Sequence, residues 1–331
     1  MYMKLQKPSS LFWSWGAYVF LPINIILGTI ISSNGASIEE LLISLFLALF
    51  IMMVLAYPAV CLSSMYGKNY SQSIRYFWGN RKIANFFIIL VPLISIGWYA
   101  IQTTMFAKFI QLYIGKETHI FVLLIIGMSY IFALGVTKFE YSWLKNAGII
   151  GMLFLIIVFA ANIKLKCDIK YGFIRLNCVL DYTIQILGTW IFSSVTCIMD
   201  ITSYVKEGKK GFKYIIFATF LTNILLIALG YFINTNIETM AATSIVNLIA
   251  LLVAIWTTND SNFYSTMRSL EELGISKIKT VLCVPLISCV LSLLMVEKFE
   301  TYLIEWLSLM SWVGIPIGII WWIFYLKEGK V

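Results

Sequence analysis

Residues 257–262 form a polar run between two apolar stretches, 248–256 and the pair Phe263 and Tyr264. In order, the run consists of Thr257, Thr258, Asn259, Asp260, Ser261 and Asn262. A carboxylate at the centre of a bilayer costs about 2.5–3.5 kcal/mol on insertion scales. We therefore expect these side chains to face a cavity lined by protein or water, and the run is the first candidate for a binding site.

The spacing of the two threonines is suited to a cation. Thr257 and Thr258 follow Ala254 by three and four residues, so in a helix both hydroxyls and the Ala254 carbonyl converge on one face. Such hard oxygen ligands suit Na⁺, or a proton-bearing water in its place. The alternative is that each hydroxyl bonds back to a carbonyl of the preceding turn, which is the common arrangement of intramembrane threonine.

The composition identifies the solvent in which these residues must work. Of 331 residues, 60% are hydrophobic and 12% are charged, and the mean hydropathy is +0.89. Soluble domains carry about 25% charged residues, so the chain is predicted to be an integral membrane protein forming a single unit over residues 1–331. We interpret the net charge of +8 as a topology signal and not as a sign of nucleic-acid binding.

Apolar segments of roughly 20 residues, long enough to cross a hydrocarbon core of about 30 Å, recur along the whole chain. Ten helices are predicted, at about 11–33, 41–63, 84–114, 119–138, 143–163, 184–205, 212–234, 241–268, 278–296 and 301–326. The first segment is too long for a cleavable signal peptide and lacks a small-residue cleavage site. Most of the 24 Lys and Arg fall on one side, which predicts a multi-pass protein of the cytoplasmic (plasma) membrane with both termini in the cytoplasm.

Two of these segments carry helix-breaking or small residues at mid-depth. In the first, Pro22 removes a backbone donor and disfavours helix at Leu21, while Gly16 and Asn24 flank it. In the sixth, small and hydroxylated residues cluster between Gly188 and Thr196. Close packing of helices is the alternative explanation for small residues in a membrane.

The breaks occupy equivalent positions in two halves of five helices, about 11–163 and 184–326. The third and eighth segments also match, because each carries polar residues at mid-depth. Five helices per half place the halves in opposite orientations. Interrupted segments at corresponding positions of inverted halves indicate a secondary transporter with a binding site near the bilayer midplane.

Cysteine and histidine residues suggest little chemistry. Cys167 and Cys178 share one external loop, where a disulfide would form in an oxidising compartment. The single histidine, His119, has no Cys or His neighbour in sequence. We therefore expect no His-based catalysis, no cofactor and no metal site other than a Na⁺ site at the cation-binding residues.

Residues 256–265, which include the polar run, closely resemble the helix-8 signature of cytosine permeases in the nucleobase:cation symporter-1 family. Residues 97–107, which begin with Gly97 and Trp98, look like the helix-3 motif of that family. Residues 193–209, with Asp200 and Tyr204, are similar to its helix-6 ending, and the segment around Trp306 looks like its helix 10. The resemblance covers nearly all of the chain.

The resemblance implies an all-α, leucine-transporter-type fold with ten transmembrane helices as two inverted five-helix repeats. By position, it implies a cation at carbonyls near Gly16, Val19 and Ala254 and at the hydroxyls of Thr257 and Thr258. The substrate would lie among Phe20, Ser95, Trp98, Gln102, Trp190, Ser193, Asn259, Asp260 and Asn262. Core packing is the alternative for Phe20 and Trp98, and capping of a locally unwound helix is the alternative for Asn259 and Asp260.

The chain departs from the family in two respects. Members generally have two helices beyond the ten predicted here. In the first segment, residues 21–24 replace the small residues that cytosine permeases usually show, so Asn24 becomes a further candidate for substrate contact.

The interrupted segments predict a transporter, not an enzyme, and the resemblance implies that it imports cytosine or a related nucleobase with Na⁺ or H⁺ by alternating access. Two alternatives stay open: an importer of a hydroxymethylpyrimidine, hydantoin or allantoin-like heterocycle, and a non-transporting membrane sensor of such a ligand. Thr257 and Thr258 favour Na⁺, whereas a buried Asp260 could carry a proton. The expected partners are the heterocycle and the lipid bilayer, and the oligomeric state is open.

Overall fold

The computed structural model describes residues 6–114, 146, 148–153, 156–157, 170–233 and 245–328. The predicted helix at 119–138 and most of the one at 143–163 lie outside the described residues, as does Cys167. Cys178, its predicted partner in a disulfide, has a free thiol.

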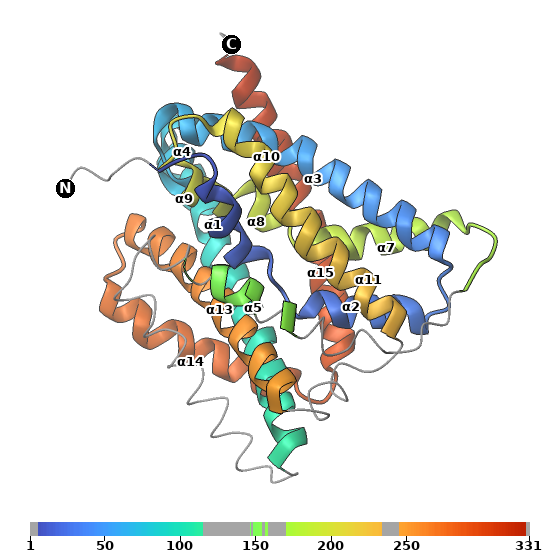
Figure 1. Ribbon diagram of the computed structural model, residues 1–331. Helices are drawn as coiled ribbons and strands as arrows, with labels where there is room; N and C mark the ends of the chain where they lie inside the picture. Colours follow the sequence, from blue (N-terminus) through green and yellow to red (C-terminus); the bar gives the residue numbers. More distant parts are fainter. Residues whose placement is uncertain are drawn as a thin grey trace.

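The described chain is a bundle of helices (Figure 1). In chain order these are α1 (Ser10–Val19), α2 (Ile23–Ser33), α3 (Ile38–Tyr66), α4 (Tyr70–Trp78), α5 (Arg81–Ile114), α7 (Leu176–Gly188), α8 (Ile191–Val195), α9 (Cys197–Thr202), α10 (Gly208–Thr219), the π-helix η1 (Phe220–Ile224), α11 (Leu225–Ile233), α13 (Ile245–Glu272), α14 (Lys277–Met295) and α15 (Phe299–Lys327).

Five described helices are long and apolar enough to cross a membrane, and a sixth span is added if α1 and α2 count as one. The chain is therefore a multi-pass membrane protein. The predicted segments agree with α3, α5, α13, α14 and α15 to within about four residues at each end. The short helix α4 was not predicted, because its nine residues are too few and too polar to resemble a span.

The predicted break in the first segment is confirmed. Helices α1 and α2 meet at an angle of 55° across residues 20–22. Pro22 stands at the N-cap of α2 with φ −55°, and Phe20 leaves the helical region with ψ 70°. Because proline has no N–H and crowds the preceding residue, the helix cannot run through this point and restarts at Ile23.

The sixth segment is also interrupted, but its predicted extent of 184–205 is wrong. Helix α7 begins eight residues earlier, at Leu176, and ends at Gly188. A turn at Thr189 and Trp190 separates α7 from α8, and a non-helical Thr196 separates α8 from α9. Three short helices therefore replace one predicted span.

The eighth segment is continuous. Helix α13 runs through the polar run without a break, so the alternative of a locally unwound helix capped by Asn259 and Asp260 is wrong. Helices α5 and α13 lie side by side and run in opposite directions (Figure 1). The rings of Tyr99 and Phe263 are in contact between them, with their centroids 6.4 Å apart. The polar side chains therefore project from an intact helix.

Both ends of the described chain lie at the same end of the bundle (Figure 1). The Gln6 amide donates to the Tyr204 carbonyl at 2.8 Å, and the Tyr66 hydroxyl donates to the carboxylate of Glu328. Tyr66 ends α3 and Tyr204 follows α9, so both described ends of the chain meet the ends of these helices.

Helix α2 packs directly against α11 through glycine. A Cβ added at Gly28 would lie 2.0 Å from the Ile227 carbonyl oxygen, and one at Gly230 would lie 2.0 Å from that of Ile25. The two backbones are therefore in close contact, which only residues without a side chain permit.

We predict that Gly28→Ala lowers the free energy of unfolding by about 1–3 kcal/mol, because the added methyl group forces α2 away from α11. Thermal denaturation of the purified protein in detergent measures the effect. Gly172→Ala is the matched control, since its nearest new contact would lie at an ordinary 3.8 Å. Equal stability of the Gly28 and Gly172 variants would contradict the close packing.

Candidate functional site

The hydroxyls of α13 reach the break in helix 1, the bent span made of α1 and α2. The Thr258 hydroxyl donates to the Phe20 carbonyl at 3.1 Å and to the Ala254 carbonyl at 3.0 Å. One turn further on, the Ser261 hydroxyl donates to the Ala17 carbonyl at 3.1 Å. These contacts join α13 to α1 across the break.

The break itself explains why these two carbonyls are available. In a continuous helix the Ala17 carbonyl would accept from the amide of Leu21, but that amide donates to Val19 at 2.9 Å. The Phe20 carbonyl would likewise accept from Asn24, whose amide donates to Leu21 at 3.0 Å. Both carbonyls are buried in an apolar bundle and take their hydrogen bonds from α13 instead.

Two hydroxyls of the predicted cation site bond to the same carbonyl of α13. Thr257 and Thr258 both donate to the Ala254 carbonyl, at 2.9 and 3.0 Å, so the back-bonding alternative describes their geometry. These hydrogen bonds link the two hydroxyls with the carbonyls of Ala254 and Phe20, and all four are neutral oxygens. Among the residues of the described ranges, no group of three or more His, Cys, Asp or Glu gathers that could hold a metal ion.

The helix-1 carbonyls that reach α13 differ from those predicted. Gly16 accepts from the Phe20 amide and Val19 accepts from the Leu21 amide, both at 2.9 Å, so both are used within helix 1. Phe20 and Ala17 supply the carbonyls instead. The sequence signal for them was Pro22, because a helix that ends there withdraws the amides of Leu21 and Asn24 from the Ala17 and Phe20 carbonyls.

The predicted residues of α5 lie on one stripe of the helix. Ser95, Trp98 and Gln102 recur at intervals of four or fewer residues, and Tyr99, which contacts α13, lies within the same stripe. All three predicted residues are buried. The opposite side of α5 packs on α14, where the Ser292 hydroxyl donates to the Ala100 carbonyl at 2.9 Å.

Buried amides from α5 and α13 have polar atoms without protein partners. Both side-chain amide atoms of Gln102 and of Asn259, and Nδ2 of Asn262, have no hydrogen-bond partner within the described part of the chain. Gln102 lies about one turn after Tyr99 on α5, and Asn259 lies about one turn before Phe263 on α13. Because the rings of Tyr99 and Phe263 are in contact and the helices are antiparallel, both amides lie one turn from this contact in the same direction. These amides therefore lie at similar height on facing helices.

Asp260 is not grouped with the other polar residues of α13. At about 100° per residue it projects roughly 160° around the helix from Thr258, whereas Asn262 projects within about 40° of it. Asn259 and Asn262 thus lie between the face that meets α1 and the face that meets α5. Asp260 is fully buried on the side of the helix opposite Thr258.

The aromatic residues predicted for the site occupy different positions. The Phe20 ring packs over Gly16, where an added Cβ would lie 2.8 Å from it, and is thereby part of the core. Trp190 forms the turn between α7 and α8, and its indole Nε1 has no partner in the ranges that the structure describes. Ser193, on α8, is half-buried.

Trp306 was predicted only as part of a helix-10 resemblance, and it packs against α5 at Gly97. A Cβ added at Gly97 would be 2.2 Å from its indole ring. Its Nε1 is buried and, among the described residues, lacks a hydrogen-bond partner. Gly97 is therefore required for the tryptophan to approach α5, and Trp306 joins the candidates for ligand contact.

A polar network that the sequence did not predict lies near the end of the bundle where the described chain starts and ends. The carboxylate of Asp200 accepts from the Ser265 hydroxyl at 2.8 Å and from the Tyr70 amide at 3.3 Å. Ser265 also bonds the Tyr18 hydroxyl at 2.9 Å. Helices α1, α4, α9 and α13 thus meet at one buried carboxylate.

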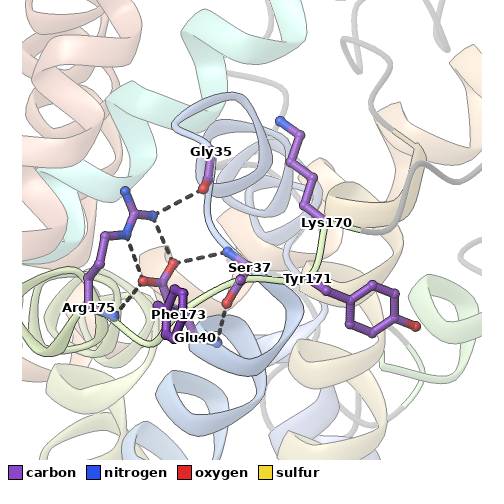
Figure 2. Close-up of a pocket in the computed structure, with 8 residues that line it drawn as sticks. Gly35, Ser37, Glu40, Lys170, Tyr171, Phe173 and Arg175 are labelled. Carbon is purple, nitrogen blue, oxygen red and sulfur yellow. Dashed lines mark hydrogen bonds and ion pairs between the residues drawn. The ribbon is translucent and has the colours of Figure 1, made fainter.

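At the opposite end of α3, a cavity of about 640 Å³ lies between the turn before α3 and residues 170–175. Figure 2 shows the Arg175 guanidinium facing the buried carboxylate of Glu40, with Nε–Oε1 and Nη2–Oε2 distances of 2.8 Å. The Ser37 amide donates to the same carboxylate at 2.9 Å. None of the predicted site residues lines this cavity. We interpret the contact between Glu40 and Arg175 as an anchor of the loop that leads into α7.

No protein-family model matches the chain, and no curated protein matches its sequence. Membership of the nucleobase:cation symporter-1 family therefore stays a prediction. Among solved structures, the chain is similar to the crystal structure of a mutant manganese transporter from Eremococcus coleocola, with a TM-score of 0.66 and 11% identity. The match covers 96% of this chain and 78% of that chain. The chain thus has the fold of a membrane transporter.

Proposed function

We propose that the chain is a secondary transporter that imports cytosine or a related nucleobase together with Na⁺ or H⁺ by alternating access. The proposal includes ten helices in two inverted repeats of leucine-transporter type, and a plasma-membrane location with both termini in the cytoplasm. The observation that carries it is the pair of buried amides, Gln102 and Asn259, whose four polar atoms have no partner among the described residues.

Unpartnered amides are costly in a protein interior. A buried donor or acceptor left without a hydrogen bond costs about 1–3 kcal/mol, and the great majority of such groups are paired. Several gather here on facing helices, as expected where a ligand supplies the missing bonds. An amide presents a donor beside an acceptor, which complements the edge of a nucleobase.

The neighbouring side chains suit the faces of such a ligand. Trp98 lies on the α5 stripe one turn before Gln102. Trp306 packs against Gly97, which projects about 100° around α5 from Trp98. Indole rings stack well on flat heterocycles and bury a large apolar area. The combination of amide edges with aromatic faces favours a planar nitrogen heterocycle as the substrate class.

The geometry at the break supports coupling between the two ligands. A cation held by Thr258 and the Phe20 carbonyl would order the backbone of residues 20–22. That segment sets the direction of α2, which carries Asn24 in its first turn. Each ligand would then raise the affinity for the other by the same factor, as linkage requires.

Basic residues support the proposed orientation. Lys68, Arg75, Lys206, Lys209 and Lys327 follow or flank the helix ends near which the described chain begins and ends. This is the distribution that the positive-inside rule associates with the cytoplasmic side.

Uptake of radiolabelled cytosine, adenine, hypoxanthine, uracil, allantoin and hydroxymethylpyrimidine by cells carrying the protein tests the proposal. We expect accumulation of at least one compound, and the preferred compound separates a nucleobase carrier from one for the other heterocycles. Binding without accumulation would identify a sensor instead. No uptake and no binding of any of the six would refute the assignment.

We predict that Thr258→Val raises the cation concentration needed for half-maximal uptake by about tenfold, because the variant loses an oxygen ligand while keeping its volume. Uptake measured with Na⁺ and pH varied independently gives this value and identifies the coupling ion. Thr266→Val is the matched control, since that hydroxyl donates to the Asn262 carbonyl within α13 at 2.8 Å. An unchanged cation dependence in Thr258→Val would argue against the site.

Replacement of either amide should weaken heterocycle binding. We expect Gln102→Leu and Asn259→Leu to reduce affinity about tenfold or more, since each removes a donor and an acceptor that face the ligand. Thr103→Val is the control on α5, because its hydroxyl donates to the Tyr99 carbonyl at 2.8 Å. Equilibrium binding to purified protein measures the affinities, and unaltered binding in both leucine variants would rule out this pair as the ligand site.

A further inference from the structure

A second pair of buried amides lies beside the break in helix 1. Asn24 stands in the first turn of α2, and Asn223 stands in the π-helix η1. Both side chains are fully buried. Nδ2 of Asn24 donates to Oδ1 of Asn223, and this bond uses one polar atom of each amide.

The remaining two atoms form a donor beside an acceptor. Oδ1 of Asn24 and Nδ2 of Asn223 have no hydrogen-bond partner in the portion of the chain that is described. This result does not depend on which way each amide is oriented. Two amides that share one hydrogen bond always leave a free donor on one and a free acceptor on the other.

The backbone is irregular on both sides of this pair. Residues 20–22 are non-helical on one side, and the other side is one turn of π-helix within the α10–α11 segment. Single π-helical turns are rare and occur frequently at functional sites. Here the π-helix includes Asn223, the residue that meets Asn24.

The surrounding packing holds the two amides in fixed positions. Gly28 and Gly230 bring α2 and α11 into direct backbone contact, and the Thr29 hydroxyl donates to the Gly230 carbonyl at 3.3 Å. On the other side of the break, the Trp15 indole donates to the Thr219 hydroxyl at 2.9 Å. Any two amides that share one hydrogen bond leave a donor and an acceptor over. Here both are fully buried without another partner in the described ranges, which is costly unless a ligand supplies the bonds.

We propose that Asn24 and Asn223 form a subsite for a planar cis-amide or lactam group. The ligand N–H donates to Oδ1 of Asn24, and its C=O accepts from Nδ2 of Asn223. Nucleobases and hydantoins carry this group, so the subsite deepens the proposed function and rests on it for the identity of the natural ligand. Its chemistry excludes analogues in which the ring N–H is methylated.

The test uses the purified full chain in detergent and two small probes, 2-pyridone, which has the lactam N–H, and N-methyl-2-pyridone, which lacks it. We expect the wild-type protein to bind 2-pyridone about tenfold more tightly, as measured by calorimetry or ligand-observed NMR. In Asn223→Leu and Asn24→Leu this ratio falls to about one. Asn223→Asp, which keeps the acceptor for Asn24 and replaces the free donor, gives the same loss if a leucine variant does not fold.

Two controls locate the effect. Thr222→Val changes the neighbouring residue of η1, whose hydroxyl donates to the Ala218 carbonyl at 2.7 Å, and should keep the tenfold ratio. Thr103→Val on α5, whose hydroxyl donates to the Tyr99 carbonyl at 2.8 Å, should keep it as well. Equal binding of the two probes by the wild-type protein, or an unchanged ratio in the Asn223 variants, would overturn the subsite.

The outcomes separate the subsite from the proposed function. If cells take up none of the six heterocycles while the purified protein discriminates between the lactams through Asn223, the transport assignment fails and the subsite stands. If uptake occurs and the lactam ratio is unaffected by both asparagines, the subsite fails and the transport assignment stands.

Discussion

The break in helix 1 places unpaired backbone carbonyls inside a membrane protein, and the packing around it follows from the need to satisfy them. Lipid offers no hydrogen bonds, so irregular backbone at membrane depth is tolerated only where protein surrounds it or where it lines a cavity. Pro22 prevents the helix from continuing, and Ala17 and Phe20 lose their usual donors. Ser261 and Thr258 of α13 replace those donors, which draws the two helices together.

This constraint explains why the polar run of α13 is organised by face and not by position along the chain. Thr258, Ser261 and Ser265 recur every three or four residues and all meet helix 1. Asn259 and Asn262 project between the neighbours α1 and α5. Because the helix is continuous, each side chain has a defined direction, and one run of six residues serves two groups of contacts.

Buried polar groups fasten the rest of the fold at its two ends. Near the described ends of the chain, Asp200 accepts hydrogen bonds from Ser265 and from the backbone of Tyr70, so four helices meet there. At the far end of α3, Glu40 holds Arg175 and the amide of Ser37. These contacts are costly to break, since the buried carboxylate of Asp200 or Glu40 would lose its hydrogen bonds. The middle of the bundle, in contrast, holds the amides whose polar atoms lack protein partners.

The sequence by itself determined the environment, the positions of most long helices and the break at Pro22, because hydropathy over about 20 residues and the missing N–H of proline act locally. It also identified Thr257, Thr258, Gln102 and Asn259 as candidates, since polar residues inside an apolar segment need a partner. Only the tertiary structure decided which carbonyls of helix 1 meet α13, that Asp260 projects away from Thr258, and that Trp306 and Asn223 join the candidates. Those contacts link residues far apart in the chain. They depend on helix rotation and backbone distance, which in this fold were set by glycines at Gly28, Gly97 and Gly230 and by the π-helical turn at Asn223.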